Sequence, residues 1–427
     1  MIQRYKNIPD TFIDFEIAPF INDTGEYDSV QFTLKHAGKF PFDAAFIADQ
    51  LAIYTKAKMK LPTFAGAYAL FTPQSYEQSS SENLALFKAS LLSGTSLLDV
   101  SGGLGVDDWA FSKRFQNVVS LDIDSELNKV VRSNMAKLGL SNIQRLDADA
   151  YAFVENNVDI FDWVYMDADR RSSDKRTFAL ADTEPNIFTI QNKVFSFTNN
   201  ILLKVSPMLD IHALIDELKT VAAIWVVSAK NEVKEVLVHI ARDPRSSTLD
   251  TGYQIQDTGS SIPDITITID TIEIHAVDVS DVGNTQFHMP YGALQTEPNY
   301  ASDGLWFYEP SLALIKSNLA STYLKQHNIS QVGKHSIYGV SNVAVPGFFG
   351  RVFQLYESFE FSKGRLKTYL ANNGISKANI SKRNFPMEVA EIKKLTGLKD
   401  GGEHYLFFTT DEQGIKRVFH TGRGNGK

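Results

Sequence analysis

Short apolar runs alternate with amphipathic runs between residues 97 and 228. Six of the runs are typical of strands: SLLDV, NVVSLDI, NIQRLDA, FDWVYMD, NILLKVS and AAIWVVS. Between two of them, residues 124–139 carry an apolar stripe at helical spacing, and Gly139 ends it. Because strands and helices alternate strictly, the pattern predicts an α/β fold with right-handed crossovers and a mostly parallel, Rossmann-like sheet.

Different patterns flank this region. Residues 1–96 are mostly helical in pattern, and residues 243–263 are rich in Ser, Gly, Pro and Asp, which predicts a loop or boundary. Residues 265–277, ITITIDTIEIHAV, alternate with a period of two and predict a strand with one buried face. We therefore place a domain boundary between residues 260 and 275.

Length and composition narrow the class of protein. A chain of 427 residues, 43% hydrophobic and 22% charged, predicts two or three globular domains. No run of roughly 18 apolar residues and no secretory leader is visible, so we expect a cytoplasmic protein without a membrane partner. The absence of cysteine excludes disulfides and cysteine nucleophiles, and the nine histidines show no HxxxH spacing, so we expect no metal.

Charge is distributed unevenly along the chain. The net charge is −8, yet residues 321–427 hold 16 Lys and Arg against 8 Asp and Glu, so they carry +8 and residues 1–320 carry −16. A basic last quarter favours a polyanion such as RNA as the partner. The alternative is a basic domain that is merely solvated.

The stretch DVSGGLGVDD, residues 99–108, places a glycine-rich turn between the first strand and a helix. Glycines at 102, 103 and 105 permit positive φ angles and close approach of a ligand to the backbone. The helix that follows offers free N–H groups at its start. A nucleotide-like ligand is the leading interpretation, and a tight turn without a ligand is the alternative.

Acidic residues distinguish between two nucleotide cofactors. A dinucleotide needs a third glycine where this chain has Asp108, and carboxylates at Asp99 and Asp107 would repel its pyrophosphate. S-adenosylmethionine carries an ammonium and a sulfonium, which such carboxylates suit. Asp122 and Asp149 end the next two strands, where a ribose diol and an adenine amino group would lie. Each of these aspartates, taken singly, has a second interpretation: it is a solvated residue that caps the end of its strand.

Two further segments carry candidate chemistry. Ser79 and Glu82 have the spacing of a capping box before an apolar helix. Asp167 ends the fourth strand, where a carboxylate would accept a hydrogen bond from an amine or hydroxyl, and Lys204 and Asp210 flank the end of the fifth. A salt bridge explains Lys204 and Asp210 equally well. Without cysteine, covalent methylation at carbon 5 of pyrimidines is excluded, and nitrogen or oxygen acceptors remain.

Residues 97–205 resemble class I S-adenosylmethionine-dependent methyltransferases. The whole chain is similar to a bacterial family of such enzymes, best represented in the Bacteroidetes, with a carboxy-terminal THUMP-like domain. The similarity is carried by KMKLPTF, SYEQSSSENLALFKA, DVSGGLGVDD, YMDADRR, LLKVSPMLDI, WFYEPSLALIKS, PGFFGRVF and ISKRNFPMEVAEIKKLTGLKDGGEHYLFFTT. It implies a helical segment (1–96), a methyltransferase domain with a seven-stranded sheet (97–264), and an α+β region made of a ferredoxin-like segment (265–318) and a THUMP-like basic domain (319–427).

The resemblance also implies a site for S-adenosylmethionine. The cofactor-binding residues are then Asp99, Ser101, Gly103, Gly105, Asp122, Ile123, Asp149, Ala150 and Asp167, with Glu77, Gln78 and Ser80 closing over the methionine end. The catalytic candidates are Asp167 and Arg170, and the acceptor is expected beside Arg170, Arg171 and Lys204. The alternative to an acceptor-binding role is that Arg170 and Arg171 form ion pairs with Asp169, Asp174 or Asp182. The family has Asp-Pro-Ala-Arg-Arg here, whereas Ala168 replaces the proline in this chain, which makes the turn less rigid.

THUMP domains generally hold tRNA or other structured RNA, so the resemblance implies an RNA partner, tRNA or rRNA. The surface candidates for RNA contact are Arg351, Lys363, Arg365, Lys382 and Arg383, whereas most neighbouring aromatic residues are expected in the core. The leading hypothesis is an S-adenosylmethionine-dependent RNA methyltransferase. The alternatives are a methyltransferase of proteins or small molecules, and a non-catalytic RNA-binding protein with a relict cofactor fold.

Overall fold

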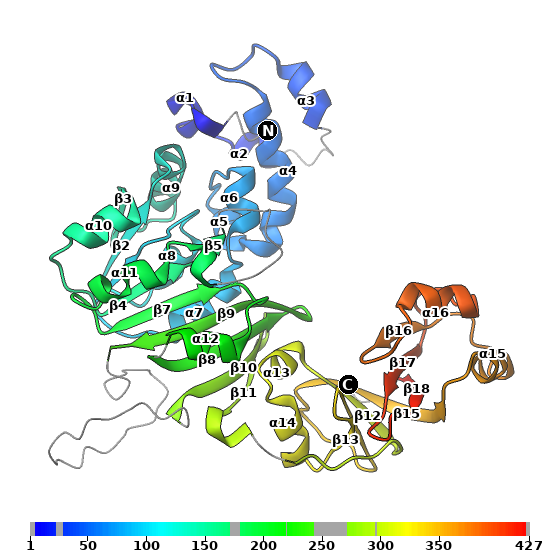
Figure 1. Cartoon of the computed structure of the whole chain (residues 1–427). Helices are drawn as coiled ribbons and strands as arrows, with labels where there is room; N and C mark the ends of the chain where they lie inside the picture. Colours follow the sequence, from blue (N-terminus) through cyan, green and yellow to red (C-terminus); the bar gives the residue numbers. More distant parts are fainter. Residues whose placement is uncertain are drawn as a thin grey trace, which may run out of the picture. The chain divides into compact units, whose positions relative to one another are not determined.

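The computed structural model describes residues 5–22, 29–170, 180–218, 220–242, 271–294 and 297–423 (Figure 1). The chain forms two compact units. The first contains residues 1–222 and 236–267, and the second contains residues 223–235 and 268–427.

The first unit begins with a helical segment. Its helices are α1 (Asp10–Ile13), α2 (Ala18–Asn22), α3 (Ser29–His36), α4 (Ala45–Lys60), α5 (Pro62–Gly66), α6 (Pro73–Gln78) and α7 (Glu82–Ser90). A cluster rich in phenylalanine holds the earliest of them together, with Phe12, Phe32, Phe42 and Phe46 all buried. The predicted helical start of the chain is confirmed.

Strands and helices then alternate as predicted. The strands are β1 (Ser96–Asp99), β2 (Asn117–Asp122), β3 (Ile143–Asp147), β4 (Trp163–Asp167), β7 (Asn200–Val205) and β9 (Glu232–Ala241). The helices between them are α8 (Val106–Phe111), α9 (Ser125–Lys137), α10 (Ala150–Asn156), α11 (Ile187–Val194) and α12 (Ile211–Leu218). All neighbouring pairs among β1, β2, β3, β4 and β7 are parallel, and β9 is antiparallel to β7. The carboxyl ends of the parallel strands therefore meet at one edge.

A short antiparallel pair follows β4 directly. It consists of β5 (Asp169–Arg170) and β6 (Thr183–Glu184), and the 3-10 helix η2 (Leu180–Asp182) precedes β6. Backbone pairing therefore joins residues 169–170, which follow β4, to residues 183–184, which precede α11.

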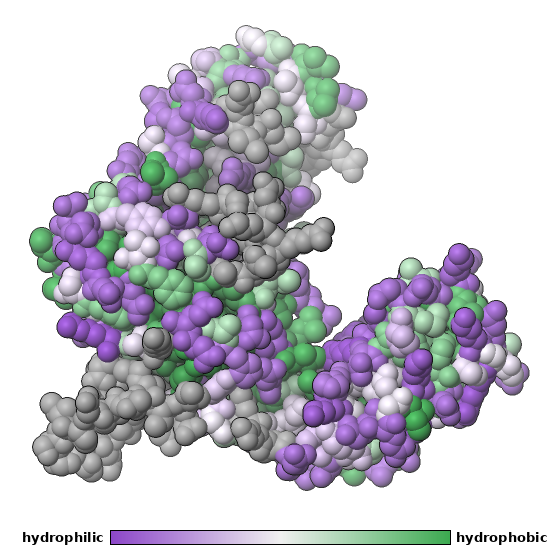
Figure 2. Space-filling view, in the orientation of Figure 1, coloured by the Kyte–Doolittle hydropathy of each residue, from purple (hydrophilic) through white to green (hydrophobic). Residues whose placement is uncertain are grey.

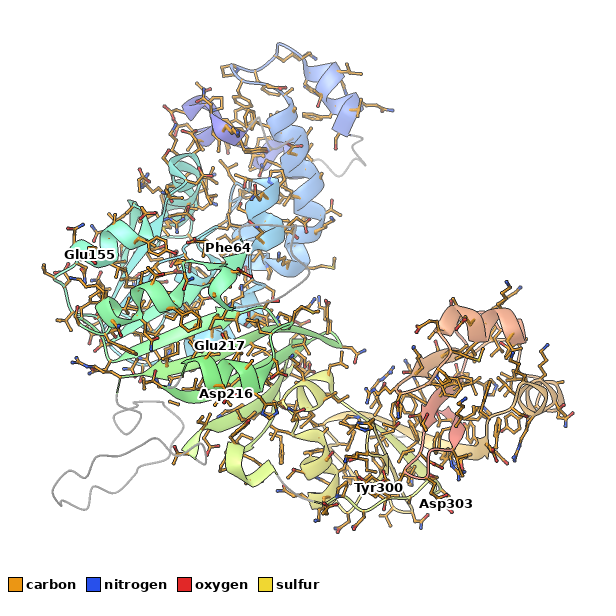
Figure 3. The ribbon with its side chains drawn as sticks, in the orientation of Figure 1. Phe64, Glu155, Asp216, Glu217, Tyr300 and Asp303 are labelled. Atoms are coloured by element: carbon orange, nitrogen blue, oxygen red, sulfur yellow. The ribbon has the colours of Figure 1, made fainter. Side chains whose placement is uncertain are left out.

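Helix α12 shows why the amphipathic runs cover the sheet. It buries Ile211, Leu214, Ile215 and Leu218, whereas Asp216 and Glu217, labelled in Figure 3, are exposed. The strands beneath are apolar on both faces: Leu97, Leu98, Ile201 and Leu202 have no exposed surface. This burial pattern is typical of a parallel sheet covered on both sides.

The sheet has nine strands rather than the predicted seven. Its order is β11-β10-β8-β9-β7-β4-β1-β2-β3, where β8 is Val221–Ala229, β10 is Glu273–Ser280 and β11 is Gly283–Pro290. Of the two additional strands, β10 begins within the period-two segment and β11 follows that segment in the chain. Residues 265–270 of the segment lie outside the described part. Residues 274–277 are all buried, so the prediction of one buried face is wrong for β10, because it lies between β8 and β11 and α13 (Leu312–Lys316) packs against it.

The rest of the second unit is built on another sheet. The 3-10 helix η5 (Tyr291–Leu294) and α13 accompany β12 (Trp306–Pro310), α14 (Ala320–Gln326), β13 (Ser330–Gly333), β14 (Ser336–Ser341), β15 (Gly350–Glu360), α15 (Lys363–Asn372), β16 (Asn379–Lys382), α16 (Val389–Thr396), β17 (His404–Thr410) and β18 (Lys416–Gly422). The strand order is β13-β14-β12-β15-β18-β17-β16. Phe348, Phe349, Phe353, Phe359 and Phe385 are buried, so most of the aromatic residues next to the basic candidates lie in the core, as predicted.

In Figure 2, hydrophilic residues cover most of the visible face, and hydrophobic residues are scattered among them. Among the described residues, none of the helices combines the length and apolar character required to cross a membrane.

Candidate functional site

The glycine turn after β1 has the backbone that the sequence predicts. Gly103 and Gly105 have φ angles of 50° and 79°, in the left-handed region that glycine adopts most readily, and Gly105 directly precedes α8. Gly102 is required for a different reason. A Cβ there would lie 1.9 Å from Nη1 of Arg145 and 2.3 Å from Oγ of Ser120.

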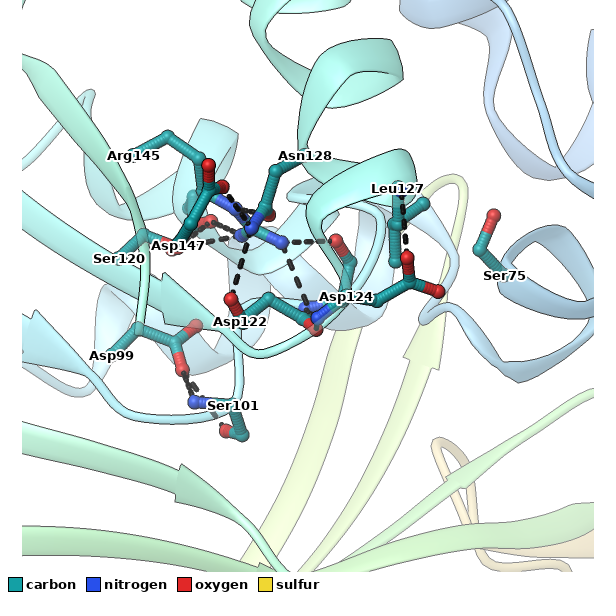
Figure 4. Close-up of polar contacts among 12 residues, drawn as sticks. Ser75, Asp99, Ser101, Ser120, Asp122, Asp124, Leu127, Asn128, Arg145 and Asp147 are labelled. Carbon is teal, nitrogen blue, oxygen red and sulfur yellow. Dashed lines mark hydrogen bonds and ion pairs between the residues drawn. The ribbon is translucent and has the colours of Figure 1, made fainter. Parts of the chain in front are cut away.

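The buried guanidinium of Arg145, on β3, contacts the turn (Figure 4). It donates hydrogen bonds to the carbonyl oxygen of Gly103 at 2.7 Å and to Oγ of Ser120 at 2.7 Å. Its Nη1 lies 3.2 Å from Oδ2 of Asp108, and its Nη2 lies 3.4 Å from Oδ2 of Asp122. One cation thus neutralises two carboxylates and fixes the turn. The sequence analysis missed this role, although an arginine within an apolar strand was a usable signal.

Ser101 connects the ends of two strands. Its hydroxyl donates to Oδ1 of Asp99 at 2.9 Å and accepts from the backbone N–H of Asp167 at 2.7 Å. Asp99 is buried, and burial together with the charge of Asp108 raises its pKa well above the ordinary value. Contact of Asp99 with a cofactor stays a prediction.

Asp122 lies at the end of β2, beside the turn. Its Oδ2 accepts from the N–H of Gly103 at 2.9 Å, and its Oδ1 accepts from the N–H of Asp124 at 2.9 Å. The next residue, Ile123, exposes 73% of its surface. A carboxylate bound to the turn and an exposed apolar residue beside it are compatible with a ribose and an adenine, and both roles stay predictions.

Asp149 follows β3 and caps α10. Its Oδ1 accepts from the N–H of Ala152 at 2.9 Å, and Ala150 begins the helix. Both residues are half-buried. Because the cap occupies only one acceptor position of the Asp149 carboxylate, the predicted contact with an adenine amino group remains compatible with this placement.

A second buried charge lies on the other side of the turn. Lys88 of α7 has no exposed side-chain surface, and its Nζ lies 3.0 Å from Oδ1 of Asp107. Tyr165 donates its hydroxyl hydrogen to Oδ2 of Asp107 at 2.9 Å. Burial raises the pKa of Asp107, but the nearby charges of Lys88 and Lys204 outweigh it, so that the pKa is lowered. The sequence analysis missed Lys88, whose position among apolar residues of an amphipathic helix was the available signal.

Residues 77–80, which precede α7, differ in their distance from the glycine turn. Ser80 accepts a hydrogen bond from Nζ of Lys88 at 2.6 Å and donates to Asp107, in the first turn of α8, at 3.4 Å. Glu77 and Gln78 are exposed, and Glu77 pairs with Lys56 at 3.7 Å. Cofactor binding by these three residues stays a prediction.

The predicted capping box is wrong. Ser81 caps α7 instead of Ser79, with its Oγ accepting from the N–H of Leu84. The carboxylate of Glu82 accepts from the N–H groups of Thr63 and Phe64, at the start of α5. The spacing misled because Glu82 satisfies the free N–H groups of another helix. This bond helps to hold Phe64, labelled in Figure 3, in contact with Trp109 of α8.

Asp167 lies at the end of β4, opposite Lys204 of β7. Oδ2 of Asp167 and Nζ of Lys204 are 2.5 Å apart, and both side chains are partly exposed. The alternative of a salt bridge between Lys204 and Asp210 is therefore wrong, because Lys204 pairs with Asp167. The carboxylate of Asp210 instead accepts from the N–H of Ala213. The N–H of Ala168 donates to the carbonyl oxygen of Lys204 at 3.1 Å. A proline would lack this donor, so the bond offsets the lost rigidity of the turn.

Arg170 and Arg171 are predicted to lie beside the methyl acceptor, and the side chain of neither is described. The backbone of Arg170 belongs to β5, where it pairs with Thr183. Arg171 lies outside the described residues. The proposed roles of both arginines stay predictions.

In the second unit, two of the predicted RNA-binding residues share one carboxylate. Arg351 donates to Oε2 of Glu309 at 2.6 Å, and Arg383 donates to Oε1 at 3.3 Å. Arg383 also lies over the ring of Tyr338, 4.5 Å from its centroid. The positive charge of this pair is therefore partly neutralised within the unit.

The other basic candidates lie on or near α15 and β16. Lys363 and Arg365, in the first turn of α15, are exposed. Lys382 pairs with Glu388. Among the five candidates, Lys363 and Arg365 therefore have the most accessible charge.

Known proteins are similar to this chain both over most of its length and in its carboxy-terminal part. A family model described as THUMP domain-like matches residues 350–423. Two relatives from strains of Mycobacterium tuberculosis, named as uncharacterized S-adenosylmethionine-dependent methyltransferases, are 23% identical over 372 residues, covering 84% of this chain and 91% of theirs. A crystal structure from Porphyromonas gingivalis, described as a candidate methyltransferase, is 25% identical with a TM-score of 0.81, covering 96% of this chain and 98% of its own.

The fold, the turn and these relatives define a class: a methyltransferase-type α/β domain combined with a THUMP-like domain. This chain is homologous to S-adenosylmethionine-dependent methyltransferases over most of its length, and it carries the THUMP-like domain at its carboxy-terminal end. The predicted resemblance is confirmed in both parts.

Proposed function

We propose that this protein is an S-adenosylmethionine-dependent methyltransferase that modifies a nitrogen or oxygen atom of RNA, either tRNA or rRNA. The observation that supports it most strongly is the convergence of β1, β2 and β4 on the glycine turn. Asp122 binds the turn directly, and Asp167 is joined to it through Ser101. In open parallel sheets, ligands bind at this edge.

The residues at this edge suit S-adenosylmethionine. A Cβ at Gly103 would meet only the carbonyl oxygen of Ser101, at 3.8 Å, so the turn is open to a ligand on that side. The Asp122 carboxylate accepts two backbone hydrogen bonds and retains further acceptor positions for a ribose diol.

Bound S-adenosylmethionine would supply a methyl group activated by a sulfonium. The contribution of the chain is to position and orient the acceptor, which accounts for about 7 to 11 kcal/mol of barrier reduction in well-ordered reactions. The Asp167 carboxylate accepts a hydrogen bond from the acceptor N–H or O–H and thereby directs the lone pair of that atom. Lys204 holds this carboxylate at the strand end.

Support for RNA as the substrate comes from the carboxy-terminal quarter. It carries a net charge of +8, and its THUMP-like match covers residues 350–423. Lys363 and Arg365 present exposed cations on α15, where phosphates would be contacted. Arg351 and Arg383 contribute less to phosphate binding because Glu309 already pairs with both.

Methyl transfer from tritiated S-adenosylmethionine to total RNA from a strain lacking the gene tests this function. We expect label in RNA with the wild-type protein and none with Asp167→Ala. Label in the protein fraction instead would favour the second enzymatic hypothesis. Binding of RNA without methyl transfer would favour the non-catalytic hypothesis.

A further inference from the structure

Three aromatic side chains stack across neighbouring strands of the second unit. Trp225 of β8, His275 of β10 and His288 of β11 are direct partners in the strand register. The rings of Trp225 and His275 are 5.1 Å apart at an interplanar angle of 20°, and those of His275 and His288 are 4.9 Å apart at 17°. Glu273, two residues before His275, lies on the same face of β10.

The two histidines and the glutamate form a compact cluster. Nδ1 of His288 lies 3.1 Å from Oε2 of Glu273. One ligand atom from each of the three residues lies within 4.8 Å of the others. Glu273 and His288 are partly exposed, with 39% and 58% of their side-chain surface accessible. An ion therefore has access to the cluster from solvent.

His275 is the buried member of the cluster. Only 8% of its surface is accessible, and its Nδ1 has no hydrogen-bond partner among the described residues. Such a buried polar atom is unusual in a native protein. An imidazole nitrogen without a protein partner is available to bind a metal ion.

We propose that Glu273, His275 and His288 bind a divalent transition metal, with Zn²⁺ as the preferred ion. Two imidazole nitrogens and a carboxylate oxygen are a common ligand set for zinc. Zinc to ligand distances of about 2.0 to 2.2 Å require the side chains to rotate toward a common point. The exposed side leaves a fourth position for water. The ion joins β10 to β11 and fixes their register.

The linear sequence did not predict this site. The expectation of no metal rested on histidine spacing within one helix or loop. Here residues 275 and 288 are brought together by the antiparallel pairing of a hairpin. The proposal is independent of the methyltransferase function, because it concerns residues of the second unit only.

Calorimetric titration of Zn²⁺ into the metal-free full-length protein tests the site. We expect one equivalent bound with micromolar or tighter affinity, and at least tenfold weaker binding by His288→Ala and by Glu273→Gln. His335→Ala removes an exposed histidine outside the cluster and should bind as the wild type does. Because residue 288 is exposed, its replacement leaves the fold intact, which circular dichroism verifies.

Tryptophan fluorescence gives a second measurement of the same site. Co²⁺ bound beside His275 should quench the fluorescence of Trp225, and Trp225→Phe should lose most of that quenching. The proposal is overturned if the wild type binds no zinc. It is also overturned if the affinity for zinc is the same in the wild type, His288→Ala and Glu273→Gln.

Discussion

The Nζ atom of Lys204 lies 2.5 Å from Oδ2 of Asp167, and the two residues are direct partners in the parallel pair of β4 and β7. The ammonium thereby fixes the carboxylate at the strand end where the proposed acceptor binds. A carboxylate held in place accepts a hydrogen bond from one direction only. Methyl transfer to a specific atom requires such a fixed orientation of the acceptor.

Replacement of either partner should lower the rate of methyl transfer. We expect Asp167→Ala to lower kcat by about 100-fold or more, because the acceptor is no longer oriented. Lys204→Met should lower it less, because the carboxylate remains. Single-turnover transfer to RNA measures both rates, with exposed Lys58→Met as the control. Equal rates for Asp167→Ala and the wild type would remove Asp167 from the mechanism.

Arg145 should contribute strongly to stability. Arg145→Met leaves Asp108 buried without its cation, a change that costs about 3 to 5 kcal/mol in buried pairs. Arg132→Met is the matched control, since Arg132 forms a partly exposed ion pair with Asp147, and it should cost less than about 1 kcal/mol. Urea denaturation measures both values. Similar losses for the two variants would contradict the proposed support of the glycine turn.

Gly102→Ala tests the close packing beneath the turn. The added Cβ would overlap Arg145 and Ser120, and overpacking of this kind costs about 1 to 3 kcal/mol. Gly364→Ala, in the first turn of α15, adds a Cβ with no atom within 4 Å and should leave stability unchanged or slightly increased. Thermal denaturation compares the two. An unchanged Tm for Gly102→Ala would show that Arg145 moves freely.

His239 should make the first unit less stable in acid. Burial lowers its pKa to about 4, from an ordinary value near 6.5, so the unfolded chain binds a proton that the folded chain does not. The stabilisation is complete above about pH 6.5 and is lost as the pH falls towards 4, by about 3 kcal/mol in total. His239→Gln should flatten this part of the stability profile, whereas exposed His335→Gln should not. Parallel profiles for the wild type and His239→Gln would contradict the prediction.

The strands were predictable because each is a short apolar run bounded by turn residues. β1, β2, β3, β4 and β7 lie within the predicted segments, since a parallel sheet buried on both faces requires such runs. The additional strands β10 and β11 were not predictable, because pairing between β8 and β10 joins residues about 50 positions apart in the chain.

The positions of the carboxylates at the strand ends were predictable, whereas the buried cations that pair with carboxylates around the turn were not. Asp122 and Asp167 follow directly from their places at strand ends. Lys88 and Arg145 do not, because each acts through partners on other elements. Glu82 illustrates the same limit: its bond to α5 competes with the local cap that its spacing suggests. Contacts between distant segments decided these cases.

Calorimetric titration of S-adenosylmethionine into the full-length protein tests the central claim most directly. We expect one equivalent bound by the wild type and at least tenfold weaker binding by Asp122→Asn, whereas exposed Asp159→Asn should bind normally. The account is contradicted if the wild type releases no heat of binding, or if Asp122→Asn binds as tightly as the wild type.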